Sequence, residues 1–121
     1  MGSIRALRGA TTCDVDEPAH ITERVAALLE RVLARNEVDK EDLVSILFTA
    51  TDDLHSMFPA AAARTIGLGD VPLICARELD VVGGTPRCVR VLVHLSTTKP
   101  RSALHHVYLE GAKGLRDDLP E

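Results

Sequence analysis

The sequence predicts an α+β domain in which helices cover one face of a mixed β-sheet. Three observations lead to this fold class: one apolar stripe of helical period, several apolar or alternating runs of strand length, and polar or glycine-containing connections between them. A chain of 121 residues is long enough to bury one hydrophobic core but too short to form two domains, so we expect a single domain over residues 1–121.

The strands are predicted from their length and apolar content. Residues 4–10 are expected to form the first strand, which ends at Gly9 and is followed by a polar connection over residues 11–16. Residues 43–50 form a continuous apolar run, which is typical of a central strand buried on both faces. Residues 102–109 are expected to form the last strand.

The main helix is predicted from apolar residues that recur at the spacing of one helix face. These residues are Ile21, Val25, Leu28, Leu29, Val32 and Leu33. Acidic side chains at Asp16 and Glu17 would favour its N-terminus, and the helix should end near Asn36. Residues 60–64 are rich in alanine and predict a short second helix, which Gly67 terminates.

The segment after the short helix has the pattern strand, turn, strand. Residues 73–78 are a short apolar run, residues 83–86 (Gly-Gly-Thr-Pro) predict a chain reversal, and residues 89–95 alternate with a period of two. We therefore expect a hairpin whose turn sets the separation of two charged residues, Glu78 and Arg90.

Arg90 is the unusual residue of this segment. Alternation places it on the strand face opposite to Val89, Val91, Val93 and Leu95, and on the same face as Cys88, Leu92 and His94. A long charged side chain is rarely buried unless it is paired, so one interpretation is an ordinary exposed sheet face. The other interpretation is a binding site.

Composition and charge exclude several classes of function. Aromatic residues make up 2% of the chain, so stacking platforms for nucleic-acid bases are essentially absent. The formal net charge of -4 provides no general basic field for a polyanion. No apolar run has the length of a membrane span or resembles a signal peptide, so we expect a cytoplasmic protein that binds neither nucleic acid nor membrane.

The chain lacks the motifs of metal, cofactor and covalent chemistry. It contains no glycine fingerprint for phosphates and no nucleophile elbow. Cys13, Cys75 and Cys88 are odd in number and have no paired Cys or His spacing, so neither a disulfide framework nor a zinc site is expected. His105 and His106 would point to opposite faces of a strand and would not share a metal. We expect no metal and no cofactor.

What remains is a set of arginines with one carboxylate, Glu78. The arginines are Arg8, Arg64, Arg90 and Arg116. A planar guanidinium binds carboxylates through two hydrogen bonds, so this set suits a small ligand with several anionic groups. An ordinary solvated surface would have the same composition, and the residues alone leave both interpretations open.

Several motifs, in order along nearly the whole chain, resemble the monofunctional chorismate mutases of the AroH type. They are Arg5-x-x-Arg8-Gly9-Ala10-Thr11-Thr12, Ala50-Thr51-x-Asp53-Leu54-His55-x-x-Phe58-Pro59-Ala60, Val71-Pro72-x-x-Cys75-x-x-Glu78, Asp80-Val81-x-Gly83-Gly84, Cys88-x-Arg90-Val91 and His106-Val107-Tyr108-Leu109. The resemblance implies a homotrimer that forms a pseudo-α/β-barrel, with active sites in the clefts between subunits.

The resemblance also implies the reaction, which is the Claisen rearrangement of chorismate to prephenate in aromatic amino-acid biosynthesis. This reaction needs no nucleophile, proton transfer or cofactor. In the implied catalytic roles, Arg90 donates to the ether oxygen and Glu78 accepts the ring hydroxyl. The implied substrate-binding residues are Arg8, Phe58, Ala60, Arg64, Leu73, Ile74, Cys75, Tyr108, Leu115 and Arg116.

Family resemblance further implies how these residues come together. Phe58 and Arg64 would come from the adjacent subunit, and a mobile C-terminal tail from about residue 111 would close Leu115 and Arg116 over the mouth of the site. Strict alternation would place Cys75 and Glu78 on opposite faces, so we expect the strand to bulge or end between them.

Two points separate this chain from a simple family match. Ala61 stands where members of the family can carry a lysine, so one charge at the rim of the site is missing. The same trimeric architecture is used by reactive-imine deaminases, so the alternative function is a small-molecule-binding or imine-deaminase-like protein. The pair Glu78 and Arg90 favours the mutase, because a pocket that only binds an anion gains nothing from a carboxylate.

Overall fold

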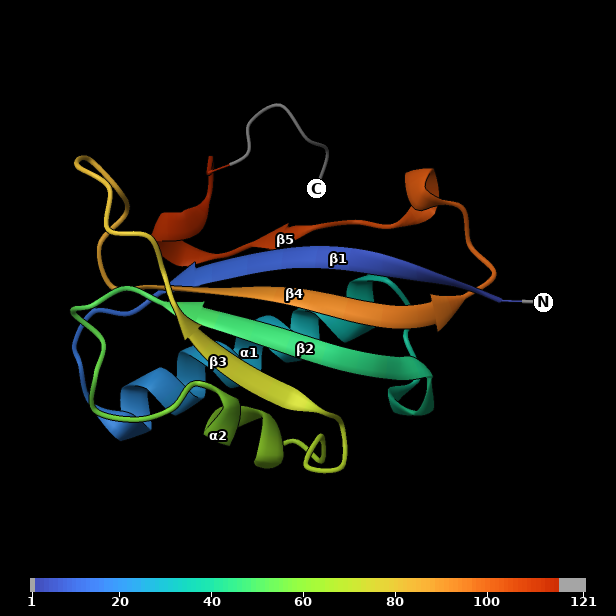
Figure 1. Ribbon diagram of the computed structural model, residues 1–121, viewed down its shortest axis with the longest axis horizontal. Helices are drawn as coiled ribbons and strands as arrows, with labels where there is room; N and C mark the ends of the chain where they lie inside the picture. Colours follow the sequence, from blue (N-terminus) through green and yellow to red (C-terminus); the bar gives the residue numbers. More distant parts are fainter. Residues whose placement is uncertain (1, 116–121) are drawn as a thin grey trace.

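The protein folds as a mixed five-stranded sheet with two α-helices on one face, in a computed structural model that describes residues 2–115 (Figure 1). The strands are β1 (Ser3–Thr12), β2 (Leu43–Ala50), β3 (Leu73–Arg77), β4 (Cys88–Thr97) and β5 (Val107–Tyr108), in the sheet order β3-β2-β4-β1-β5. The α-helices are α1 (Pro18–Arg35) and α2 (Ala60–Arg64), and short 3-10 helices lie at Lys40–Asp42, Arg101–Ala103 and Glu110–Ala112. The predicted α+β class is confirmed.

The core lies between α1 and the sheet. The helix buries five residues of its predicted stripe, Ile21, Val25, Leu28, Leu29 and Val32, whereas the sixth, Leu33, is only partly buried at the edge of the core. From the facing strand β4, the side chains of Val89, Val91, Val93 and Leu95 pack into the same core. Burying one such side chain completely contributes about 1.5–3 kcal/mol to the free energy of folding. The helical layer thus stabilises strands whose other face is free to carry a site.

β1 is longer than predicted, because Gly9 lies inside the strand and does not end it. A Cβ atom at Gly9 would lie 3.2 Å from Leu28 Cδ1 and 3.1 Å from Val91 Cγ2. The missing side chain therefore allows α1 to approach the sheet closely. The strand continues to Thr12, which pairs with Cys88 of β4.

The predicted hairpin between β3 and β4 is wrong, because β2 lies between these two strands (Figure 1). β3 pairs with β2 in parallel, and β4 pairs with the other edge of β2. A tight hairpin uses a loop of about 2–5 residues. The connection over residues 78–87 is longer and can cross the end of β2. The predicted chain reversal lies within this loop, where the Gly84 N–H donates to the Val81 carbonyl at 2.9 Å.

β2 is an interior strand, as expected, but the prediction that both of its faces are buried is wrong for the single chain. Ile46 and Phe48 point into the core and are buried. Leu47 and Thr49 point to the face without helices and are only half-buried. The apolar residues that dominate this run do not reveal that one face is uncovered, although the polar Ser45 and Thr49 both lie on that face.

The last strand is much shorter than the predicted segment of residues 102–109, since β5 contains Val107 and Tyr108 only. The backbone groups of His105 form hydrogen bonds with the Asn36 side chain and not with a neighbouring strand. Its Nδ2 donates to the His105 carbonyl at 2.9 Å, and its Oδ1 accepts from the His105 N–H at 2.6 Å. Asn36 also follows the last residue of α1, as expected, so the helix end and the approach to β5 are joined at one residue.

Candidate active site

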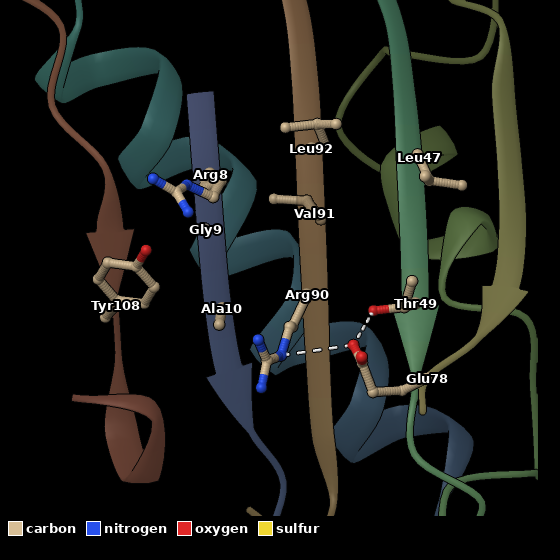
Figure 2. A pocket seen from close by; sticks show the side chains of 10 residues that line it. All are labelled: Arg8, Gly9, Ala10, Leu47, Thr49, Glu78, Arg90, Val91, Leu92 and Tyr108. Atoms are coloured by element: carbon tan, nitrogen blue, oxygen red, sulfur yellow. Dashed lines mark hydrogen bonds and ion pairs between the residues drawn. The ribbon is translucent and has the colours of Figure 1, made fainter. Parts of the chain in front are cut away.

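A cavity of about 190 Å³ opens on the sheet face that the helices leave uncovered (Figure 2). It is lined by Arg8, Gly9, Ala10, Leu47, Thr49, Glu78, Arg90, Val91, Leu92 and Tyr108. The register of the strands sets this arrangement, because Arg90 pairs with Ala10 on one side and with Thr49 on the other. Neighbouring residues in register point to the same face, so β1, β2 and β4 each contribute side chains to one cavity.

Arg90 and Glu78 form an ion pair at the β2 side of the cavity, with Arg90 Nε 3.4 Å from Glu78 Oε2. Glu78 follows the end of β3, and its N–H donates to the Ala50 carbonyl at 3.0 Å. The Thr49 hydroxyl donates to Glu78 Oε2 at 2.6 Å, and the Leu79 N–H donates to Oε1 at 3.2 Å. Both carboxylate oxygens are therefore held in place.

Arg8 and Tyr108 lie on the other side of the cavity, on β1 and β5 (Figure 2). The backbone N–H of Arg8 donates to His106 Nδ1 at 2.9 Å, which helps to fix the approach of β5 to β1. Tyr108 is 7% exposed, and its hydroxyl is buried without a hydrogen-bond partner among the described residues. A buried hydroxyl without a partner is unfavourable, so this group is suited to a polar atom of a ligand.

The charges around the cavity are unevenly distributed. A second hollow of about 510 Å³ adjoins the first at Glu78 and Arg90, and it is lined by Asp52, Asp53 and Asp80. The hydrogen bonds and positive charge of the neighbouring Arg77 hold the pKa of Asp52 below its ordinary value, so this carboxylate is ionised. Arg77 balances the charge of Asp52, but Asp53 and Asp80 add further negative charge to the second hollow, so an anionic group is favoured at the side of the first cavity that carries Arg8 and Arg90.

The predicted substrate-binding residues on β3 are not gathered at this cavity. The strand ends at Arg77, between Cys75 and Glu78, as expected. Leu73 and Cys75 nevertheless pack against the core. Ile74 is 65% exposed and lies beside a smaller hollow near the β3 edge.

Leu115 lies beside Tyr108, at the β1 side of the sheet. It packs against a small cluster formed by Ala10, Cys88, Tyr108 and Ala112. The Gly111 N–H donates to Thr12 Oγ1 at 2.8 Å, which connects the segment before Leu115 to the end of β1. The predicted role of Arg116 concerns a residue outside the described ones.

Phe58, Ala60 and Arg64 belong to α2 and the loop before it. Ala60 is buried in the core between the helices and the sheet. Phe58 is 76% exposed and Arg64 is exposed as well. None of the three lines the cavity of its own chain.

The loop that carries Phe58 is anchored by Asp16. This carboxylate accepts hydrogen bonds from the backbone N–H groups of His55 and Ser56 at 3.1 and 3.0 Å. Desolvation alone would raise the pKa of Asp16, but the hydrogen bonds from Ser56 and His55 outweigh it and hold the pKa below its ordinary value. Asp16 thus fixes a loop, where the sequence predicted a role at the helix N-terminus.

Two buried thiols, Cys88 in the cluster with Ala10 and Tyr108 and Cys13 in the main core, are not activated. Burial raises the pKa of the Cys13 thiol to about 11. Burial also raises the pKa of the Cys88 thiol, and the neighbouring Arg90 only partly opposes this shift. A protonated thiol is a poor nucleophile, so neither residue is suited to covalent chemistry at neutral pH. Within residues 2–115, His, Cys, Asp and Glu form no cluster of three or more that could hold a metal ion.

Sequence reasoning missed Thr49, Leu47 and Leu92 as lining residues of the cavity. Thr49 lies in the run that was expected to be buried on both faces, which hid its polar contact with Glu78. Its position directly opposite Arg90 depends on the pairing of β2 with β4, and a single strand pattern does not provide that register.

Comparison with known proteins gives one consistent result. Residues 4–119 match the family model described as chorismate mutase type I. The chain is 43% identical to chorismate mutase AroH of Bacillus subtilis over 96% of this chain and 92% of that protein. It is 44% identical to chorismate mutase AroH of Thermus thermophilus over 96% of both chains. A solved chorismate mutase from Clostridium thermocellum superposes with a TM-score of 0.88 at 40% identity, covering 90% of this chain and 97% of that chain.

Proposed function

The chain belongs to the chorismate mutase type I family, and from this premise we propose that chorismate binds in the cavity between Arg8 and Glu78. The protein is an enzyme that isomerises chorismate to prephenate, which decides against the imine-deaminase alternative. The observation that carries the proposed site is the ion pair of Arg90 and Glu78 at the cavity wall.

The reaction requires opposite charges at fixed positions. As the carbon–oxygen bond breaks and the carbon–carbon bond forms, the ether oxygen gains electron density and the ring fragment loses it. We assign donation to the ether oxygen to Arg90, and acceptance of the ring hydroxyl, close to the electron-poor fragment, to Glu78. Fixed charges aimed at developing charge can supply a large part of the barrier reduction, which in enzymes is about 8 kcal/mol or more.

The second requirement is to hold a flexible substrate in its compact conformation. Arg8 is assigned to one substrate carboxylate and the Tyr108 hydroxyl to another substrate oxygen. Both residues are on strands that are paired within the sheet, which supports a preorganised geometry. The two terminal nitrogens of Arg90 are turned toward β1 and away from Glu78, which leaves them available to an anionic ligand (Figure 2).

Replacing Tyr108 by Phe tests this assignment with a contrast between stability and activity. The hydroxyl has no hydrogen-bond partner among the described residues, so its removal should not lower the unfolding temperature. The same change should lower kcat/KM by about fivefold or more, because the substrate loses one hydrogen bond. Calorimetry and a direct absorbance assay of chorismate loss measure the two effects. An unchanged kcat/KM would show that the Tyr108 hydroxyl does not bind the substrate.

The same family relation supports a homotrimer in which each site is completed by a neighbouring copy. Phe58 and Arg64 do not line the cavity of their own chain, yet both are exposed and available to another copy. We assign Phe58 to packing on the substrate and Arg64 to positive charge at the rim, while Ala60, Leu73, Ile74 and Cys75 would line the same cleft. Leu115 and Arg116 would close it.

Mixing two defective variants tests the shared site. In a mixture of Arg90→Ala and Arg64→Ala chains, a site that takes Arg90 from one chain and Arg64 from another regains both residues in about a quarter of cases. Co-expression should therefore restore activity above that of either variant alone, and light scattering should give three times the chain mass. If both variants are impaired and the mixture shows no complementation, the two arginines do not come from different chains at one site, and the shared site is wrong.

The single-domain organisation is supported by the family match over residues 4–119. In the part of the chain that the structure describes, no helix has the length and apolar character needed to cross a membrane.

A further inference from the structure

We infer that Thr49 is a positioning residue, whose hydroxyl holds the Glu78 carboxylate in the orientation required for catalysis. This inference rests on the proposed role of Glu78 in the rearrangement. Thr49 lies on the open face of β2, directly opposite Arg90 in the register of the two strands. It contributes to the cavity wall, and its contact is with Glu78.

The distances around Glu78 Oε2 rank its two partners. The Thr49 hydroxyl lies 2.6 Å away, whereas Arg90 Nε lies 3.4 Å away. A hydroxyl-to-carboxylate distance of about 2.5–2.7 Å is typical of a strong charge-assisted hydrogen bond, while about 2.7–2.9 Å would be typical of a strong contact from a guanidinium. The contact from Thr49 is thus the shortest of the three that this carboxylate makes, since the Leu79 N–H lies 3.2 Å from Oε1. Arg90 lies beyond the distance of a strong guanidinium contact.

The direction of the Thr49 hydroxyl is itself well defined. β2 is hydrogen-bonded on both sides, to β3 and to β4, so its backbone is fixed. Threonine is branched at Cβ and has few χ1 rotamers in a strand. The hydroxyl thus provides a rigid donor at a fixed point of the cavity wall.

Without this donor, Glu78 would compete with the substrate for the guanidinium of Arg90. An arginine and a carboxylate prefer to pair through two parallel hydrogen bonds, and Glu78 freed from Thr49 could move onto the terminal nitrogens of Arg90. Those nitrogens now face β1 and the cavity (Figure 2). The hydroxyl of Thr49 therefore keeps Glu78 at a distance where both charges remain available to the reacting molecule.

Thr49→Val removes the hydroxyl and keeps the branched shape, and Thr49→Ser keeps the hydroxyl. We expect Thr49→Val to lower kcat/KM by about tenfold or more, and Thr49→Ser to restore it to within about threefold of the unmodified enzyme. Ser45→Ala is the matched control. Ser45 lies on the same strand, and its hydroxyl contacts His94 at 3.3 Å instead of Glu78, so kcat/KM should stay unchanged. Unfolding temperatures are measured in parallel, with Thr49→Ala used if the valine variant does not fold.

A double-mutant cycle with Glu78→Ala separates positioning from a merely structural effect. If Thr49 acts through Glu78, adding Thr49→Val to Glu78→Ala should lower kcat/KM by less than about twofold further. A loss in the Glu78→Ala background as large as in the unmodified enzyme would overturn the inference. So would full activity of Thr49→Val while Glu78→Ala is impaired. Full activity of Glu78→Ala would instead overturn the proposed role of Glu78.

Discussion

Replacing Arg90 by Ala is expected to lower the turnover number by at least about a hundredfold, the loss typical when one preorganised donor to a developing negative charge is removed. The side chain is 45% exposed and extends into the cavity, so its removal should leave the helix–sheet core intact. A direct absorbance assay of chorismate loss gives kcat, and circular dichroism checks that the variant is folded.

Two further variants define what the Arg90 result means. Arg90→Lys keeps the positive charge but loses the planar fork, so its turnover should lie between that of Arg90→Ala and the unmodified enzyme. Arg31→Ala removes an exposed arginine from α1, in the helical layer, and should have no effect. Near-normal turnover of Arg90→Ala would contradict the assigned mechanism.

Glu78→Ala is expected to produce the second large loss, with kcat/KM lower by about tenfold to a hundredfold. The substrate would lose an acceptor for its ring hydroxyl and a negative charge near the electron-poor fragment. The side chain is 20% exposed at the cavity wall, and Arg90 would remain in contact with solvent, so the fold should survive. Kinetics over a range of chorismate concentrations separate kcat from KM.

The affinity of the Glu78→Ala variant for an unreactive dicarboxylate gives an independent check. Removing a negative charge beside Arg90 should strengthen the binding of such a dianion, even while the reaction slows. Tighter binding with slower turnover is the expected combination for a carboxylate that acts on the transition state. A variant that binds more tightly and also turns over normally would show that Glu78 has no part in the reaction.

Local patterns predicted the elements of the fold well, because their signals depend on near neighbours in the sequence. The stripe of α1 and the alternation of β4 both identify a buried face, and both are confirmed. The order of strands could not be predicted in the same way. Periodicity indicates which face of β3 is buried, but it contains no information that β2 separates β3 from β4.

The candidate site was predictable in its chemistry more than in its geometry. Arginines with one carboxylate were compatible with an anionic ligand or with an ordinary solvated surface, and the motif resemblance indicated the ligand and the reaction. The convergence of β1 with β5 depends on contacts such as that of Arg8 with His106, 98 positions apart in the sequence. The support of Glu78 by Thr49 depends on strand register, which only the folded sheet defines.

The loop over residues 78–87 has a consequence for how this enzyme can diverge. Its first residue is fixed to β2 through the hydrogen bond from Glu78 to Ala50, and its last is fixed where the Arg87 N–H donates to Asp53 Oδ2 at 2.9 Å. The separation of Glu78 and Arg90 is therefore set by these two attachments and not by the glycine turn between them. We therefore expect that changes of loop length within residues 80–85, in evolution or by design, would leave Glu78 and Arg90 in place, because both attachments lie outside this segment.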